Sequence, residues 1–119
     1  PPTELLAMPV IATRVLTLST TTGDRPVRIE LSAPESDAKG WRCNFTIGWP
    51  NRTQKGFGAG VDGIQALSIA MMNIAAQLYT SSYHRDGKLR WDKPGSGYGF
   101  PIAKPLRHLL VGEDLTFDG

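Results

Sequence analysis

Alternating apolar and polar positions in the first half of the chain predict an antiparallel sheet. The clearest strand is residues 41–49, in which every second side chain is apolar and would face a core. Its apolar positions are Trp41, Cys43, Phe45, Ile47 and Trp49. Residues 11–19 and 27–33 are rich in β-branched and apolar residues, and turn-forming residues at 20–26 lie between them. These two segments therefore predict a β-hairpin.

Two shorter strands complete the predicted meander. Residues 53–58 can return beside the third strand after a turn at 50–52. Gly56 and Gly58 are expected to leave the end of this fourth strand weak or bulged. Residues 88–91 are a candidate for a short fifth strand.

After Asp62 the apolar period lengthens from two residues to between three and four, which predicts a long α-helix. The apolar residues that would line its core face are Ile64, Leu67, Met71, Ile74 and Leu78. Asp62 is a suitable N-cap, and Gln65 completes a capping box. The helix should run to about Tyr83 and break before Gly87.

A second apolar stripe lies beside this core face. It consists of Ile69, Met72, Ala76 and Tyr83. A helix that covers one sheet does not need this much apolar surface. Either the C-terminal segment folds over the stripe, or another chain contacts it, and a homodimer through Ile69 and Met72 is the candidate. Pro105 suits the first turn of a short helix in the C-terminal segment.

These patterns together predict an α+β fold. It would be an antiparallel four-stranded β-meander, with the candidate fifth strand, packed against one long α-helix and followed by a short C-terminal helix. We expect one domain over residues 10–112. Residues 1–9 would be a disordered head or a remnant of cloning, and residues 113–119 a flexible acidic tail.

Composition narrows the classes of partner. Thirteen Lys and Arg against eleven Asp and Glu give a net charge of only +2, which does not favour nucleic acid. One cysteine excludes an internal disulfide, and two histidines give no zinc-ligand spacing. No run approaches the roughly 20 apolar residues of a membrane helix, and residues 1–10 lack the regions of a signal peptide. We expect a cytoplasmic protein without membrane, metal or cofactor.

The segment from Gly58 to Gly63 has the spacing G-x-G-x-x-G, which can mark a dinucleotide site between a strand and a helix. The preceding strands, however, are joined by hairpin-length turns, whereas a dinucleotide fold needs helical crossovers. Asp62 would also place negative charge where a phosphate should bind. We therefore interpret the glycines as a structural turn.

We predict no catalytic residue. Cys43 lies between Trp41 and Phe45 on the apolar face, and a buried thiol without a basic neighbour stays protonated. His84 and His108 lie near the ends of predicted helices, where an imidazolium suits the helix dipole.

Basic and aromatic residues alternate in the segment 85–107. The candidate partner-binding residues within it are Arg85, Arg90, Trp91, Tyr98 and Phe100. Arg, Trp and Tyr dominate the energetics of protein interfaces, although the same mixture can stack on nucleic-acid bases or form an ordinary solvated loop. We interpret this segment as a contact for another protein.

Three motifs resemble a family of small bacterial proteins known as a domain of unknown function. They are Trp41-Arg42-Cys43, the run from Gly60 to Leu67, and Gly99-Phe100-Pro101, within a similarity over residues 13–102. The sheet-plus-helix design also resembles, by general type, the immunity proteins that neutralise bacterial toxins. This resemblance implies a non-catalytic protein that binds a cytosol-acting toxin domain. A small-ligand or nucleotide binder, an unrecognised enzyme, a nucleic-acid binder and a homo-oligomeric scaffold remain alternatives.

Overall fold

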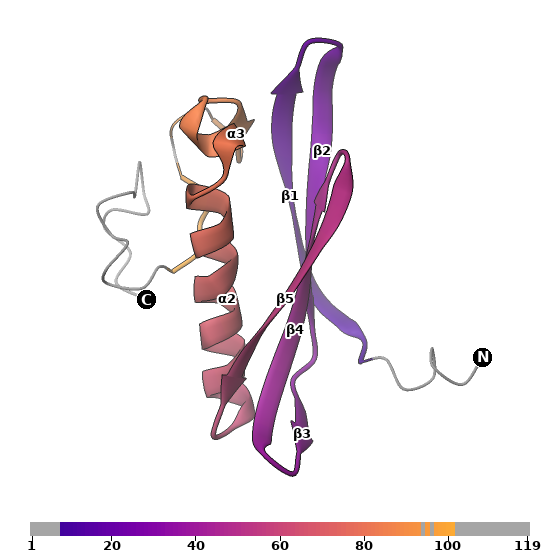
Figure 1. Ribbon diagram of the computed structural model, residues 1–119, viewed down its shortest axis with the longest axis vertical. Coiled ribbons are helices and arrows are strands. Elements are labelled where there is room, and N and C mark those ends of the chain that lie inside the picture. Colours follow the sequence, from indigo (N-terminus) through magenta and orange to yellow (C-terminus); the bar gives the residue numbers. More distant parts are fainter. Residues whose placement is uncertain (1–7, 94, 96, 102–119) are drawn as a thin grey trace, which may run out of the picture.

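The computed structural model describes residues 8–93, 95 and 97–101. It confirms an α+β fold in which an antiparallel sheet lies against one main helix (Figure 1). The strands are β1 (Val10–Thr20), β2 (Gly23–Ser32), β3 (Glu35–Asp37), β4 (Gly40–Trp49), β5 (Arg52–Gly60) and β6 (Leu89–Arg90). The main helix is α2 (Gly63–Tyr79), and α3 (Ser82–Arg85) is one short turn.

Within the described residues the sheet has six strands, because two short strands join the predicted meander of β1, β2, β4 and β5. β6 pairs with β1 and confirms the candidate strand at 88–91. The strand β3 was not predicted. One edge of β4 pairs with β5 along its length, while the other edge pairs with β3 at its start and with β2 further along. The neighbouring strands therefore follow the order β6, β1, β2, β4 and β5.

The turn between β1 and β2 is shorter than the sequence indicated. The strands pair as far as Thr20 and Gly23, which leaves only Thr21 and Thr22 between them, so the turn predicted at 20–26 is too long. Pro26 lies within β2 because β4 pairs with β2 only from Arg28 onward. The missing N–H of Pro26 therefore faces an edge where it costs no ladder hydrogen bond.

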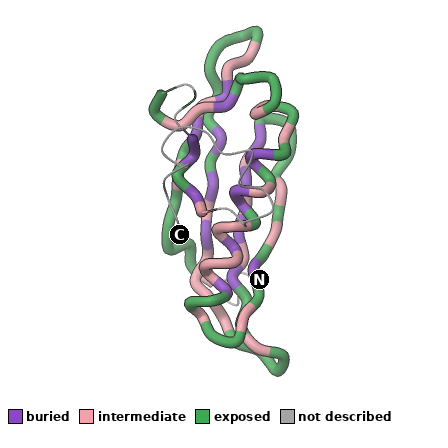
Figure 2. The backbone as a smooth tube through the Cα atoms, turned by 90° about the vertical axis from the view of Figure 1, so that its left-hand side faces the viewer, coloured by how far each residue is buried: buried purple, intermediate pink, exposed green. Residues whose placement is uncertain are grey.

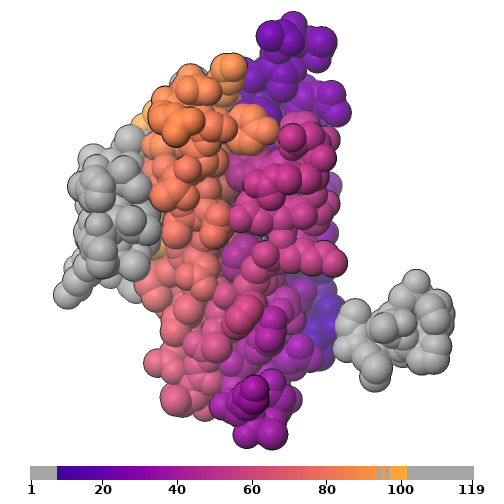
Figure 3. Space-filling view, viewed as in Figure 1, coloured from indigo at the N-terminus to yellow at the C-terminus, as the bar shows by residue number. Residues whose placement is uncertain are grey.

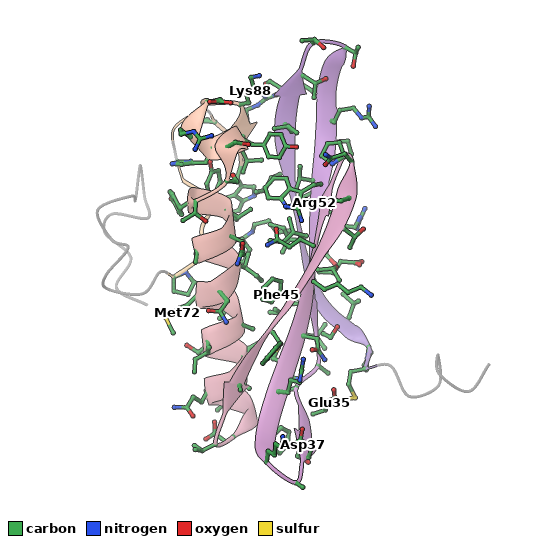
Figure 4. All side chains as sticks on the ribbon, in the orientation of Figure 1. Glu35, Asp37, Phe45, Arg52, Met72 and Lys88 are labelled. Atoms are coloured by element: carbon green, nitrogen blue, oxygen red, sulfur yellow. The ribbon has the colours of Figure 1, made fainter. Side chains whose placement is uncertain are left out.

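The face of the sheet toward α2 holds the core, as the two-residue period predicts. Cys43, Phe45 and Ile47 are all buried, and Phe45 lies between α2 and the sheet (Figure 4). Buried residues recur along the strands and along the helix (Figure 2). Its other buried strand residues are Leu16, Leu18, Val27, Ile29, Leu31, Trp49 and Leu89. Only Trp41, at the end of the alternating run, is 36% exposed.

Helix α2 packs on β5 with almost no side chain between the two backbones. A Cβ atom added at Gly58 would lie 2.5 Å from the Ala66 carbonyl oxygen and closer still to the Ala70 nitrogen. A Cβ atom at Gly60 would lie 2.7 Å from the Ala66 nitrogen. Only glycine on the strand and alanine on the helix permit this approach.

The glycines of β5 therefore have a different role from the predicted one. The strand keeps a regular register with β4 through Gly60, so its end is not bulged. Gly56 lies under the ring of Phe45, where an added Cβ would be 2.8 Å from Cε1. The alternation of glycine at positions 56, 58 and 60 makes one flat face for the helix and the Phe45 ring.

The core face of α2 also differs from the prediction. Its buried residues are Ala66, Ala70, Ile74, Ala75, Leu78 and Tyr79. Ile64, which was predicted to be in the core, is 80% exposed, and Leu67 and Met71 are only partly buried. Because the alanines must face the glycines of β5, the helix is rotated about its axis and the first larger apolar residue turns outward.

The predicted start of the helix is confirmed, but its predicted end is wrong. The Asp62 side chain accepts a hydrogen bond from the Gln65 N–H at 2.8 Å, and the Gln65 side chain accepts one from the Val61 N–H at 2.7 Å. Helix α2 ends at Tyr79 and does not reach Tyr83. The Ser81 hydroxyl donates to the Leu78 carbonyl at 2.7 Å and accepts from the His84 N–H, which begins α3.

Several predictions concern residues outside those described. They are the short helix at Pro105, the boundary at residue 112, the acidic tail at 113–119 and most of the head at 1–9.

The second apolar stripe of the helix is half-buried at all four positions, Ile69, Met72, Ala76 and Tyr83. Met72 projects from the side of α2 that faces away from the sheet (Figure 4). Dimerisation through Ile69 and Met72 stays a prediction.

The contact between α2 and β5 predicts that Gly58→Ala strongly destabilises the protein. The added methyl group would overlap the backbone at Ala66 and Ala70, and overpacking of this kind should lower the free energy of unfolding by about 3 kcal/mol. Urea titration measures the change. Ala59→Ser is the control, because this exposed neighbour should change stability by less than about 0.5 kcal/mol. Equal stability of the two variants would contradict the packing described here.

Candidate functional site

The five partner-binding residues predicted from the sequence lie in two different environments. Arg85 is exposed on α3. Tyr98 and Phe100 are 3% and 8% exposed and belong to the core, and the half-buried Trp91 packs against that core. In the structure, the rings of Tyr98 and Phe100 therefore present almost no surface to a partner.

Arg90 anchors the chain that follows the helix to the β1–β2 hairpin. Its guanidinium forms a salt bridge with Asp24 at 2.6 Å and donates to the Ser19 hydroxyl at 2.9 Å. The side chain of Arg90 is 27% exposed. These two contacts thus serve the fold, because they hold β6 at the edge of the sheet.

Arg14 organises the aromatic residues of the same segment, and sequence reasoning did not single it out. Its Nη1 atom donates to the carbonyls of Tyr98 and Gly99, both at 3.0 Å. The guanidinium carbon lies 4.0 Å from the ring centroid of Trp91 and 4.8 Å from that of Phe100. One signal could have found it, since a two-residue period places Arg14 on the inner face with Leu16 and Leu18. Its hydrogen-bond partners, Tyr98 and Gly99, are 84 and 85 positions away and had no sequence signal.

His84 and Tyr98 form a polar contact beside this cluster. His84 Nδ1 lies 2.5 Å from the Tyr98 hydroxyl, which also donates to the Leu89 carbonyl at 3.4 Å. The imidazole meets the ring of Tyr79 edge-on, with 4.7 Å between centroids. Burial lowers the pKa of His84, because loss of solvent disfavours the imidazolium. His84 thus favours the neutral form, which suits a ring held among aromatic neighbours.

A small apolar cavity lies between the inner face of the sheet, α2 and the segment around Phe100. Its volume is about 150 Å³. The lining residues are Ala12, Thr13, Arg14, Ile29, Leu31, Met71, Ile74, Gly99 and Phe100. Arg14 is the only charged residue among these described lining residues. The cavity is large enough for a few non-hydrogen atoms, and the described lining offers no group placed for chemistry on them.

A larger groove of about 190 Å³ lies where the β3–β4 hairpin meets the end of β5. The lining residues are Asp37, Lys39, Gly40, Trp41, Arg42, Phe57, Ala59 and Gly60. The guanidinium carbon of Arg42 stacks 3.7 Å from the ring centroid of Phe57. Arg42 Nε donates to Asn44 Oδ1 at 3.1 Å, and the Asn44 amide donates to Glu35 at 3.3 Å. The stacked pair is therefore held in place by a short polar network.

Exposed apolar residues also occur at this end of the molecule. Phe57 is 44% exposed, and Val61 and Ile64, at the turn into α2, are 82% and 80% exposed. We call this surface the aromatic end. It consists of Trp41, Arg42, Phe57, Val61 and Ile64. The β3–β4 hairpin and the start of α2 form the end of the molecule opposite to the β1–β2 turn (Figure 3).

The glycine-rich motif and Cys43, considered above for nucleotide binding and catalysis, both make contacts within the fold. Gly58 and Gly60 face α2, and the N–H of Gln65 in the first turn of α2 is taken by Asp62. Cys43 is buried as predicted, its thiol donates to the Ser32 carbonyl at 3.2 Å, and burial raises its pKa. Within the described ranges, no three metal-ligating side chains come together and no helix is long and apolar enough to cross a membrane.

The structure thus defines an α+β protein with an arginine-anchored aromatic segment at one end and an exposed aromatic groove at the other. The chain belongs to the family described as Domain of unknown function (DUF6968), which matches residues 12–102. The family resemblance inferred over 13–102 is therefore confirmed. No curated protein and no solved structure matches the chain.

The lowered pKa of His84 predicts a pH dependence of stability. In the unfolded chain the imidazole titrates near its ordinary pKa of 6.5, whereas the folded protein resists protonation. The unfolded state therefore binds more protons below about pH 6.5, so the free energy of unfolding should fall as the pH drops through that region. Urea titrations of the protein and of His84→Gln between about pH 7.5 and about pH 5.5 measure this loss.

The variant should lose less stability over this pH range than the unaltered protein. His108 is present in both chains, so its own titration cancels from the comparison. Equal pH slopes for the two proteins would show that His84 is as easily protonated in the folded state as in the unfolded one.

Proposed function

We propose that this protein acts by binding another protein in a stoichiometric complex, with the aromatic end as its contact surface. The observation that carries the proposal is the groove in which Arg42 stacks on the exposed ring of Phe57, with Trp41 also among the lining residues. Tryptophan, other aromatics and arginine supply most of the binding energy in protein interfaces when a partner buries them. An exposed apolar cluster of this kind marks an interaction surface.

The fixed position of the Arg42 side chain supports a preorganised contact. Stacking on Phe57 and the bond to Asn44 fix the long side chain, so binding costs little of its conformational entropy. The same stacking leaves the edge of the guanidinium able to meet a carboxylate or a backbone carbonyl. The side chains of Arg42 and Phe57 would therefore already be in position when a partner binds.

We further propose that the partner is a toxin domain acting in the cytosol, which would make this protein an immunity protein. The support is the general resemblance in size and design. The groove carries Lys39 and Arg42 against Asp37, a balance of one positive charge that suits a partner with an acidic contact. Blocking such a partner requires only a stable complex and no catalytic group.

Rescue of growth tests this proposal. The protein is co-expressed with each toxin domain encoded beside its gene, and the same experiment is repeated with the double variant Arg42→Glu/Phe57→Ser. We expect the unaltered protein to rescue growth. The double variant should fail, because it reverses the charge and removes the ring at the centre of the groove. Both substitutions are at exposed outer-face positions, so circular dichroism should show the same fold.

The matched control is Arg85→Glu, which makes the same charge reversal on α3. This variant should still rescue growth. If Arg85→Glu loses rescue while the double variant keeps it, the contact lies on the segment predicted from the sequence and the aromatic end is not the interface. If the unaltered protein rescues growth from no neighbouring toxin, the immunity proposal is rejected.

A further inference from the structure

The helix α2 covers only part of the inner face of the sheet. Its main contacts are with β5 and β4, and α2 converges with β5 where the helix begins (Figure 1). β1 and β2 extend the inner face beyond these contacts. The apolar cavity of about 150 Å³ lies on that side, where β1, β2, α2 and the segment around Phe100 meet. It is therefore a space that the close packing of α2 on β5 leaves open.

The described lining of this cavity is apolar on three sides. β2 contributes Ile29 and Leu31, which are both buried in the core. α2 contributes the buried Ile74 and the partly buried Met71, and Phe100 forms a third side. Water inside the cavity would find few polar partners, whereas an apolar molecule would gain contacts on each of these sides.

Arg14, the only charged residue among the described lining, already has partners within the fold. Its Nη1 atom donates to the carbonyls of Tyr98 and Gly99, and its guanidinium stacks on the rings of Trp91 and Phe100. Because these contacts come from the protein itself, the guanidinium does not require a charged group from a ligand. The lining therefore suits an uncharged molecule.

The wall that the segment 98–100 forms is held in a fixed position. Gly99 has a φ of +78°, and a Cβ atom there would lie 2.7 Å from Arg14 Nη1. Glycine thus allows the segment to lie directly against Arg14, and the two hydrogen bonds of Nη1 keep it there. A ligand would not have to order this wall on binding, which lowers the cost of association.

The volume of the cavity defines the size of the molecule that it can hold. Protein interiors contain few spaces larger than a water molecule. An engineered apolar cavity of about 150 Å³ in another protein binds benzene. The cavity described here has a volume of about 150 Å³ and is partly open to solvent, which gives a ligand a path into it.

We propose that this cavity binds a small, uncharged apolar molecule of about the size of benzene. Burial of the apolar surface of the ligand supplies the binding free energy. The cavity shares no described lining residue with the groove of the aromatic end, so this site does not depend on the proposed protein partner. A bound ligand would also stabilise the folded protein, because the unfolded chain has no such cavity.

Methyl NMR spectra recorded during a titration with benzene test the proposal. We expect the signals of Ile29, Met71 and Ile74 to shift and to saturate, with half-saturation on the order of 1 mM. Benzoate adds a carboxylate to the same ring and is the charged comparison. It should bind at least about tenfold more weakly than benzene, since burial of its charge in an apolar cavity is unfavourable.

Two variants fill the cavity from different sides. Ala12→Leu enlarges an exposed residue of the β1 wall, and Met71→Phe enlarges a partly buried residue of the α2 wall. Each variant that keeps the circular dichroism spectrum should bind benzene about tenfold more weakly, because the added atoms occupy the space. The matched control is Ala38→Leu, the same substitution at an exposed position in the β3–β4 turn, and it should leave the affinity for benzene unchanged.

Three results would overturn the proposal. One is that the three methyl signals show no saturable shift up to the solubility limit of benzene. Another is an unchanged affinity for benzene in both filled variants. Tighter binding of benzoate than of benzene would also overturn it, and would show that Arg14 recognises an anion in the cavity.

Discussion

The direct contact between the backbones of α2 and β5 is the constraint on which most of this structure depends. Glycine at 58 and 60 and alanine at 66 and 70 allow the helix to lie closer to the strand than any larger residue would permit. Because this approach fixes the rotation of the helix, it also decides which residues of α2 enter the core. Ile74 and Leu78 then fill the core further along the helix, where the strands carry larger side chains.

The same constraint explains why the aromatic end is exposed. A helix whose first turn is pressed against glycine leaves little room for side chains beneath it, so Ile64 turns outward and Trp41 is only partly covered. Val61 lies in the short connection between β5 and α2, and its side chain stays exposed. The apolar surface that we assign to partner binding is therefore a consequence of close helix packing at one end of the sheet. Exposure of this apolar surface to water is unfavourable in free energy, and a partner that covers the surface would remove that penalty.

Much of the fold could be predicted from local patterns, and the failures share one cause. The strand at 41–49 and the cap at Asp62 depend on neighbours within a few residues, and both are confirmed. The helix face was only partly right: Ile74 and Leu78 are buried as predicted, but Ile64 is exposed and the alanines take its place, because close packing on β5 requires small residues. The role of Arg14 could not be predicted, since its partners near Tyr98 are distant in sequence and contact it only after the chain folds.

The candidate site shows that residue composition alone does not predict where an interface lies. Arginine mixed with aromatic residues is typical of interfaces, but the same mixture also anchors a segment to its own domain, as Arg14 and Arg90 do here. Composition cannot separate these two uses, because both are stabilised by the same stacking and charge-assisted bonds. Only the location of Arg42, stacked on Phe57 beside an open groove, favours a contact with another molecule.

The two edges of the sheet allow different kinds of contact. At the β5 edge, the Asn73 side chain of α2 donates to the Phe57 carbonyl at 2.8 Å, so the helix itself occupies part of the strand's bonding edge. The first half of β1, at the opposite edge of the sheet, has no such cover among the described residues.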